Sequence, residues 1–338
     1  MLTIKHILKS CVQPLLKLSV TLAFSSSTTF AYAETNQTIK REPISPIPQT
    51  IEVNKPKAQL GKILFFDTRF SKSGTISCAT CHQLEAGGDD NVTMGISSAA
   101  DKNIINTPTI FNAGYNFRQN WDGAAKTLED QIEMVMHNTH EFNNTWDNVI
   151  SRLTMDKNLS KIFKNIYKET ITKGNITDAI VEYEKTLITP NSRFDRYLRN
   201  ENDALTESEI RGYTLFKEYG CISCHQGVNV GGNLFQKFGI FYDYLAERGN
   251  IGRPDFGKFN TTNRQMDKFV FKVPSLRNIA VTAPYLHDGS AETLKEVISI
   301  MGKTQIGREL TPDEISLIES FLRSLTGKYD NKLLDKTL

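Results

Sequence analysis

Apolar residues recur at the spacing of an α-helix along most of the chain. Leu60, Ile63 and Leu64 fall on one face of a helix that begins near Ala58 and ends before the polar, glycine-containing run at residues 71–74. The same period returns in four later stretches, at residues 126–136, 146–153, 159–167 and 177–187. Because no stretch keeps the alternation of a strand, the pattern predicts a mainly α-helical fold.

Two capping boxes predict helix starts in the second half of the sequence. Thr206 with Glu209, and Thr311 with Glu314, have the Thr-x-x-Glu spacing in which each side chain bonds the other residue's backbone N–H. An apolar stretch follows each pair. A third apolar helix is expected to close at residues 301–302.

Proline and polar residues divide the chain. Residues 42–57 carry four prolines, which predicts an extended segment over the surface rather than regular structure. Polar residues dominate between 191 and 204, where we place a domain boundary. The expected organisation is an N-terminal domain at 34–200, a C-terminal domain at 201–326 and a tail at 327–338.

The first 33 residues have the features of a secretory signal peptide. Lys5 and Lys9 make a basic start, residues 15–24 are apolar, and residues 31–33 read Ala-Tyr-Ala, a small-residue cleavage site. The apolar stretch is short for a membrane span. Cleavage after Ala33 would export the mature chain, and a retained anchor would also place its globular part outside the cytoplasm.

Loss of that leader changes the charge balance. The full chain of 338 residues has a formal net charge of +2, and the leader holds three lysines and no acidic residue, so the mature chain carries −1. A chain without excess basic charge gives no reason to expect a nucleic-acid partner.

The pentapeptide Cys-x-x-Cys-His occurs twice, at Cys78 to His82 and at Cys221 to His225. It is the signature of c-type haem attachment, in which both thiols bind the porphyrin and the histidine binds the iron. A structural zinc half-site and a redox dithiol are the alternatives. The chain has five cysteines, Cys11 lies in the leader, and the two motifs use the other four. The sequence therefore predicts two covalently bound haem c groups.

The second axial position of each iron decides its role. A methionine opposite the histidine saturates the iron for electron transfer, whereas an open position permits chemistry. Met266 and Met301 both follow His225, and spacing alone does not distinguish a ligand from a core methionine.

Six further segments accompany the haem motifs. They are LGKILFFD at 60–67, NTPT at 106–109, WDG at 121–123, GVNVGGN at 227–233, VPSLRN at 273–278 and YLHDG at 285–289. With these segments the chain resembles the bacterial di-haem cytochrome c peroxidases over nearly all of its mature length.

The resemblance implies two cytochrome c-like helical domains with the active site at their interface. The haem that would react with peroxide is the N-terminal one, held by Cys78, Cys81 and His82. The haem that would receive electrons is held by Cys221, Cys224 and His225, with Met301 as its distal ligand. Related enzymes that mature a tryptophan-derived cofactor in methylamine dehydrogenase have a tyrosine at the last position, so Met301 favours a peroxidase.

The same resemblance implies three residues for the chemistry. Glu141 matches the family's catalytic glutamate, which moves a proton between the peroxide oxygens so that water can leave. Gln131 matches a distal amide that can hydrogen-bond peroxide. Trp121 matches a tryptophan that lies between the haems and can relay electrons.

One departure from the family concerns the loop after the first haem motif. Many members carry a histidine there that blocks the peroxide-reacting iron until the other haem is reduced, but no histidine lies between His82 and His137. We expect the first iron to be open without reductive activation, unless Met94, His137 or His140 substitutes. The absence also keeps a maturation-type oxidase as an alternative.

A calcium ion is a further implication of the resemblance. Asn106, Thr282 and Pro284 match a site made of one asparagine side chain and two backbone carbonyls, and oxygen ligands suit Ca²⁺. His287 matches a family residue near the domain interface and is expected to be structural, with a haem propionate as one candidate partner.

The expected protein is a periplasmic di-haem cytochrome c peroxidase that detoxifies hydrogen peroxide by reducing it to water. Its two electrons would come from a small mono-haem cytochrome c or copper protein, and a homodimer is the family expectation. The alternatives are a maturation-type di-haem oxidase acting on a partner protein, and a non-catalytic di-haem electron carrier or sensor.

Overall fold

The computed structural model describes residues 41–90, 92 and 105–335, and these belong to one compact unit. The predicted leader, with Cys11 and the cleavage site after Ala33, lies outside the described residues, as does Met94. Within them, no helix combines the length and apolar character that a membrane span needs.

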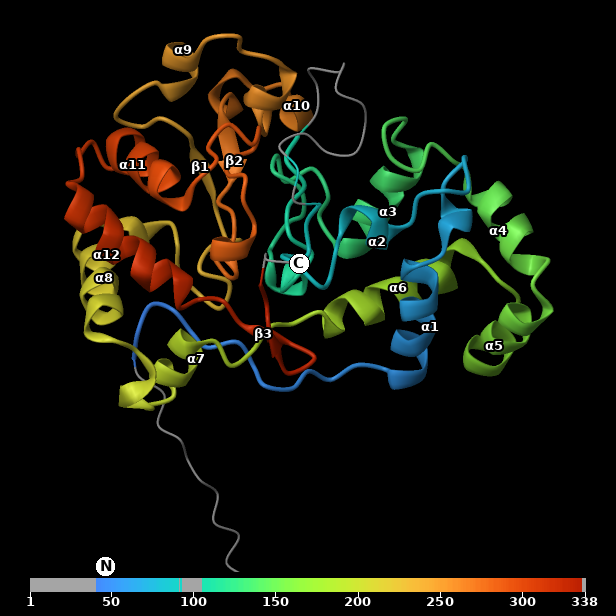
Figure 1. The fold of residues 1–338 in the computed structure, drawn as a ribbon. Helices are drawn as coiled ribbons and strands as arrows, with labels where there is room; N and C mark the ends of the chain where they lie inside the picture. The colour runs from blue at the N-terminus through green and yellow to red at the C-terminus, as the bar shows by residue number, and fades with distance from the viewer. Residues whose placement is uncertain (1–40, 91, 93–104, 336–338) are drawn as a thin grey trace, which may run out of the picture. The chain divides into compact units, whose positions relative to one another are not determined.

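Helices dominate the regular structure, which confirms the predicted fold class (Figure 1). Those of the first half are α1 Lys55–Phe65, α2 Cys78–Cys81, α3 Leu128–His137, α4 Trp146–Thr154, α5 Lys157–Tyr167 and α6 Lys173–Thr186. Helix α6 begins four residues before the predicted start because Thr172 and Asn175 form a capping box there. Helix α1 was predicted to continue to the polar run at residues 71–74, but it ends at Phe65.

One detail of the α1 prediction is wrong. Leu60 and Leu64 are buried, but Ile63 is 50% exposed. A Cβ at Gly61 would lie 1.9 Å from the carbonyl oxygen of Ala179 on α6, so the two helix backbones meet at this glycine. At 100° per residue, Ile63 points about 200° away from Gly61 and therefore leaves the contact.

A second group of helices belongs to the half of the chain that contains the second haem motif. They are α7 Arg193–Leu198, α8 Glu207–Glu218, α9 Tyr244–Arg248, α10 Phe259–Thr262, α11 Leu294–Gln305 and α12 Pro312–Arg323. Both predicted capping boxes are present, at the starts of α8 and α12. Helix α11 does not close at residues 301–302, because it continues through Met301 to Gln305.

Short elements connect the helices. The 3₁₀ turns are η1 Thr68–Phe70, η2 Ala113–Tyr115, η3 Asn202–Ala204, η4 Cys221–Ser223, η5 Arg253–Phe256, η6 Gln265–Asp267 and η7 Ile279–Val281. Two antiparallel ribbons pair β1 Phe235–Lys237 with β2 Val270–Lys272, and β3 Lys328–Tyr329 with β4 Lys332–Leu333. In the first ribbon Phe235 lies opposite Lys272.

Each half of the chain has its own hydrophobic core. The first core lies among α1 and α3 to α6 and includes Phe163, and the second lies among α7, α8, α11 and α12 and includes Phe321. A smaller cluster packs Phe65 and Phe111 against Val281, which comes from the other half. Apolar contact therefore joins the halves.

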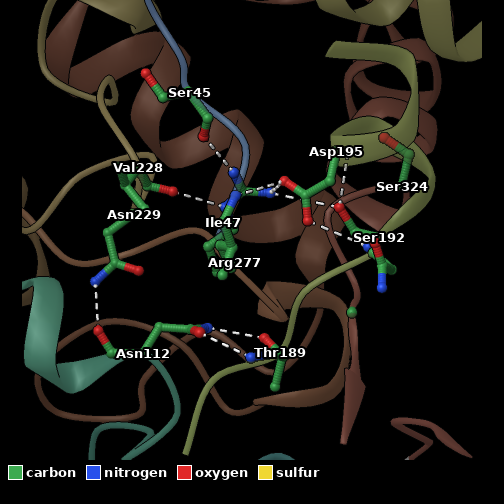
Figure 2. A network of polar contacts seen from close by, with 12 residues as sticks. Ser45, Ile47, Asn112, Thr189, Ser192, Asp195, Val228, Asn229, Arg277 and Ser324 are labelled. Atoms are coloured by element: carbon green, nitrogen blue, oxygen red, sulfur yellow. Dashed lines mark hydrogen bonds and ion pairs between the residues drawn. The ribbon is translucent and has the colours of Figure 1, made fainter. Parts of the chain in front are cut away.

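The proline-rich segment forms no helix or strand up to residue 54, but residues 55–57, predicted to be irregular, are the first turn of α1, and the segment is not simply superficial. Ile44 and Ile47 are fully buried, and Ile44 belongs to the core of the C-terminal half. The polar stretch at 191–204 contains α7, whose Asp195 bonds both the Ile47 N–H and Arg277 (Figure 2). Residues before the proposed domain boundary thus contribute to the core after it, and the boundary itself stays a prediction.

Candidate haem sites

The first motif occupies the short helix α2. Ser77 and Thr80 form a capping box at its start, and His82 follows its end. The Nδ1 atom of His82 lies 2.9 Å from the carbonyl oxygen of Gly88. Burial lowers the pKa of His82, so the ring is neutral, with Nδ1–H donating to the carbonyl and Nε2 available for iron.

The second motif begins where α8 ends. Gly220 has φ +81° and turns the chain into Cys221, and the Nδ1 atom of His225 lies 3.2 Å from the carbonyl oxygen of Val230. Burial lowers the pKa of His225 to about 4. Its Nε2 is therefore available in the same way as that of His82.

The loop that brings the Val230 carbonyl to Nδ1 of His225 has an unusual backbone conformation. Val230 is fully buried with φ +50°, a region that β-branched residues rarely adopt. Gly231 has φ +132°, and a Cβ there would meet the Pro274 carbonyl oxygen at 2.2 Å and His225 Nδ1 at 3.3 Å. Strain at a ligand-positioning loop is typical of a functional site.

The geometry does not favour the zinc or dithiol alternatives. Burial raises the pKa of Cys81 and Cys221 to about 11, and also raises that of Cys78, whereas a redox dithiol needs a lowered thiol pKa. Among the described residues, the one convergent group of potential metal ligands is Asp255, His287 and Asp288, which contains no cysteine.

A cavity of about 560 Å³ adjoins the second motif. Cys221, Cys224 and His225 line it, as does Met301 from α11, and most of its remaining walls are apolar. Met266, the other methionine after His225, is 78% exposed and is not part of the lining. The residues present fit a haem c, because two thiols, a neutral imidazole and a thioether share one largely apolar cavity.

Trp121 is fixed in the wall of the same cavity. Its Nε1–H donates to the carbonyl oxygen of Asn106 at 2.8 Å. Its own carbonyl accepts from the backbone N–H of Lys272 at 2.8 Å. Trp121 is therefore held through its indole by Asn106 and through its backbone by Lys272, which come from different halves of the chain.

Glu141 lies in the loop between α3 and α4, within electrostatic range of the first motif. Its negative charge contributes to the raised pKa of both Cys78 and Cys81. The Glu141 side chain is exposed, but the surrounding residues partly desolvate its carboxyl group, and this raises the pKa of Glu141. A hydrogen bond from Asn138 and the charge of His140 act in the opposite direction but do not cancel the effect. Gln131 is half-buried on α3.

The alternative ligands for the first iron differ in availability. Both ring nitrogens of His137 have protein partners, Nδ1 at 3.2 Å from the Asn144 carbonyl and Nε2 at 3.2 Å from Glu133 Oε1. His140 is exposed in the loop before Glu141. To bind iron through either ring nitrogen, His137 would have to give up the contact that this nitrogen makes.

The three residues of the expected calcium site converge on the large cavity. Asn106, Thr282 and Pro284 all line it. The Nδ2 of Asn106 donates to the carbonyl oxygens of Pro284 at 2.8 Å and Leu286 at 2.9 Å. The donor set is rich in oxygen, and rotation of the amide would present Oδ1 beside the same carbonyls, so these residues fit Ca²⁺.

His287 is a buried structural residue. Its Nε2 lies 2.7 Å from Asp255 Oδ1, and its ring centroid lies 4.6 Å from that of Phe271. Arg248 forms ion pairs with both Asp255 and Asp288. Its guanidinium therefore already neutralises the two carboxylates of the group Asp255, His287 and Asp288. Burial opposes ionisation of Asp255, but the bonds from His287, Gly252 N–H and Arg248 hold its pKa at about 2.

Two buried ionisable residues were missed by the sequence reasoning. Lys272 lines the large cavity and is 6% exposed, and Glu184 on α6 is 5% exposed with Oε2 unpartnered. Lys272 directly precedes the VPSLRN segment, which could have drawn attention to it. Nothing in the helical pattern around Glu184 distinguishes it from a surface acid.

Comparisons with known proteins agree with this geometry. The family model described as di-haem cytochrome c peroxidase matches residues 55–203. The cytochrome c551 peroxidase of Nitrosomonas europaea is 41% identical over 93% of this chain and 90% of its own length. The cytochrome c peroxidase Ccp of Escherichia coli is also 41% identical, over 91% of this chain and 66% of its own length.

A solved structure gives the same result for the fold. The crystal structure of a MauG-like protein associated with microbial copper homeostasis matches with a TM-score of 0.72 at 30% identity, covering 86% of this chain and 94% of that one. Both haem motifs have an imidazole available for iron, and the relatives match nearly the whole of this chain. The chain belongs to the di-haem cytochrome c peroxidase family, and it is a peroxidase of the oxidoreductase class with haem c as its cofactor.

Proposed function

We propose that the protein is a periplasmic peroxidase that reduces hydrogen peroxide to two waters with two protons and two electrons from a small soluble donor. The observation that carries the proposal is the asymmetry of the two motifs. The second shares a cavity with the thioether of Met301, whereas the first has the carboxyl of Glu141 nearby. One site is thus equipped for electron transfer and the other for proton transfer.

At the first site, held by Cys78, Cys81 and His82, the haem supplies the two-electron redox chemistry when bound. Glu141 takes the proton from one peroxide oxygen and returns it to the other, so that water rather than hydroxide leaves. Partial desolvation raises the pKa of Glu141, which suits a carboxyl that must both accept and donate a proton near neutral pH. Gln131 is proposed to orient peroxide by a hydrogen bond from its amide.

At the second site, His225 and Met301 would hold the haem iron and would leave no position for substrate. Trp121, which lines this cavity, is proposed as the relay toward the first site. The Asn106 carbonyl holds its indole and the Lys272 N–H holds its backbone, and a fixed position keeps the electron-transfer distance constant.

The surface beside the second site supports docking of a donor. Ile240 is 48% exposed and Phe241 is 66% exposed, and both belong to the lining of the large cavity. Exposed apolar side chains at the mouth of a redox cavity suit a small, transient partner. We propose a mono-haem cytochrome c or a small copper protein as that partner, and a homodimer as the working state.

Calcium and the resting state complete the proposal. Asn106, Thr282 and Pro284 would hold Ca²⁺ beside Trp121, since the Asn106 carbonyl also accepts from the indole. The first iron is proposed to be open at rest, because the histidine that would block it is absent from the sequence and His137 is engaged elsewhere.

A maturation-type oxidase acting on a partner protein is the second candidate. The missing histidine and the MauG-like structural relative favour it, whereas Met301 in the cavity of the second motif favours the peroxidase. A non-catalytic electron carrier or sensor is the third, and it requires protein ligands on both faces of both irons.

The test is spectroscopic and kinetic. Mass spectrometry of the purified chain should show two covalent haems, and EPR of the oxidised protein should show one high-spin and one low-spin iron. Peroxide turnover should then begin without prior half-reduction. A lag that half-reduction removes would mean a substitute ligand, with Met94 and His140 as candidates, and two low-spin irons without turnover would support the carrier.

A further inference from the structure

Lys272 is a buried lysine without a counter-charge. It ends strand β2 and is only 6% exposed. No carboxylate or other side chain among the described residues bonds its ammonium group, and burial alone lowers its pKa to about 8. Removing a cation from water without a partner is costly, so native proteins seldom leave such a group unpaired.

The surroundings of Lys272 identify what is missing. It lines the 560 Å³ cavity of Cys221, Cys224 and His225. Among the described residues of that lining it is the sole lysine or arginine, and no aspartate or glutamate is present. The other basic residue facing the cavity besides His225 is His287, which is committed to Asp255. The cavity therefore offers one cation and no protein anion.

We propose that Lys272 forms the ion pair with a propionate of the haem attached to Cys221 and Cys224. A haem carries two propionate carboxylates. One of them would supply the negative charge that the protein lining of the cavity lacks and would pair with the ammonium group of Lys272. This inference rests on the proposed function, because it requires a haem at the second motif. It assigns a charge partner that the haem-attachment motif does not specify.

The pair lies on the Trp121 side of the cavity. The backbone N–H of Lys272 donates to the Trp121 carbonyl at 2.8 Å, so the two residues are adjacent. A propionate paired with Lys272 would therefore be held by the residue whose backbone contacts the tryptophan proposed as the relay. Lys272 would then act as a positioning residue for this haem.

The ammonium group also sets the reduction potential of this haem. Reduction adds one negative charge to the haem, and a nearby cation stabilises the reduced form more than the oxidised form. Removing the cation should lower the potential. A tenfold shift of the one-electron equilibrium corresponds to about 59 mV.

The experiment compares three variants of the haem-loaded protein by spectroelectrochemical titration of the low-spin haem. Lys272→Met removes the charge and Lys272→Arg keeps it. Lys237→Met is the matched control, because Lys237 is an exposed lysine on the paired strand β1. We expect Lys272→Met to shift the equilibrium toward the oxidised haem by about tenfold or more, and the other two variants to stay near the wild type.

A crystal structure of the wild-type holoenzyme provides a measurement that does not depend on variant folding. A propionate oxygen within hydrogen-bond distance of Lys272 Nζ supports the proposal, and an ammonium bonded only to water or protein overturns it. An unchanged potential in Lys272→Met with two haems attached also overturns it. Absence of covalent haem from the wild type would instead refute the proposed function as a whole.

Discussion

Arg277 and Asp195 form an ion pair in which neither side chain is exposed, with Nη1 2.8 Å from Oδ1 (Figure 2). Arg277 also donates from Nε to the carbonyl oxygen of Val228 and from Nη2 to that of Ser45, each at 2.9 Å. The pair thus connects the proline-rich segment and α7 to the loop that follows His225. Because Val230 in that loop accepts from His225, the pair supports the orientation of an iron ligand.

Arg277→Met should therefore destabilise the protein strongly. It leaves Asp195 as a buried charge without its partner, and breaking a buried pair in this way costs about 3–5 kcal/mol. Chemical denaturation of the haem-loaded protein measures the loss. The double variant Arg277→Met with Asp195→Leu should lose less than the single variant, because no uncompensated charge remains.

Arg196→Met is the control for this prediction. Arg196 pairs with Glu201 at 2.7 Å, but both side chains are 44% exposed, so its removal should cost no more than about 1 kcal/mol. Equal losses from Arg277→Met and Arg196→Met would show that burial of the ion pair is unimportant.

Glu184 should make stability depend on pH. Burial, with a smaller contribution from the charge of Glu129, raises the pKa of Glu184 from 4.5 to about 8 in the folded state. The folded protein therefore binds this proton more tightly than the unfolded chain, and stability falls as pH rises from about 4.5 to 8. Glu184→Gln should be more stable than the wild type at pH 8, by about 2–4 kcal/mol, with the difference fading toward pH 5.

Glu182, two residues earlier on α6, provides a control of opposite sign. Burial opposes its ionisation, but the bonds from Lys185 and the Asn54 N–H lower its pKa overall. Glu182 therefore stabilises the folded state at pH values above its pKa in the unfolded chain, and this stabilisation is lost as pH falls through its pKa in the folded state. Denaturation at several pH values should show Glu182→Gln weaker than the wild type at neutral pH, and parallel curves for the two variants would contradict the assignment.

Glu141→Gln should abolish most peroxide turnover and leave haem attachment intact. An amide cannot accept and return the proton, and loss of a general acid–base group typically costs about 10²- to 10⁴-fold in rate. Steady-state kinetics and the optical spectra of both haems check the two parts of this prediction. Asp147→Asn, an exposed acid at the start of α4, should retain full activity.

Trp121→Phe should slow electron transfer between the haems. Phenylalanine loses the hydrogen bond to the Asn106 carbonyl, which costs about 1 kcal/mol, and has a ring that is harder to oxidise. Stopped-flow oxidation of the reduced second haem by peroxide measures the rate. Trp146→Phe loses a comparable bond, to Glu133, so equal slowing in both variants would remove Trp121 from the relay.

Chelation of calcium should lower the thermal stability of the wild type, because an ion that binds only the folded state stabilises it by mass action. In Asn106→Ala the unfolding temperature should no longer respond to chelator or to added Ca²⁺. Asn233→Ala, an exposed asparagine in the second half, should respond like the wild type. If the unfolding temperature of the wild type changed with neither chelator nor added Ca²⁺, the proposed calcium site would be wrong.

Much of the fold could be predicted because local rules govern it. The capping boxes at Thr206 and Thr311 were read correctly, since a cap depends on residues within four positions. The haem motifs are equally local. One error arose where a distant element intervened, because contact with α6 through Gly61 turned Ile63 to solvent. The start of α6 was misplaced for a local reason, since the capping box of Thr172 and Asn175 was not recognised.

The sequence by itself determined the mainly helical fold, the two Cys-x-x-Cys-His motifs and, through resemblance, the family. It specified these because covalent attachment and helix capping need only neighbouring residues. The tertiary structure decided which residues that are far apart in the sequence lie together. Met301 rather than Met266 shares the cavity of His225, Trp121 is held by both halves, and Lys272 is buried without an anion. Burial and charge pairing are properties of the packed chain, and no local pattern encodes them.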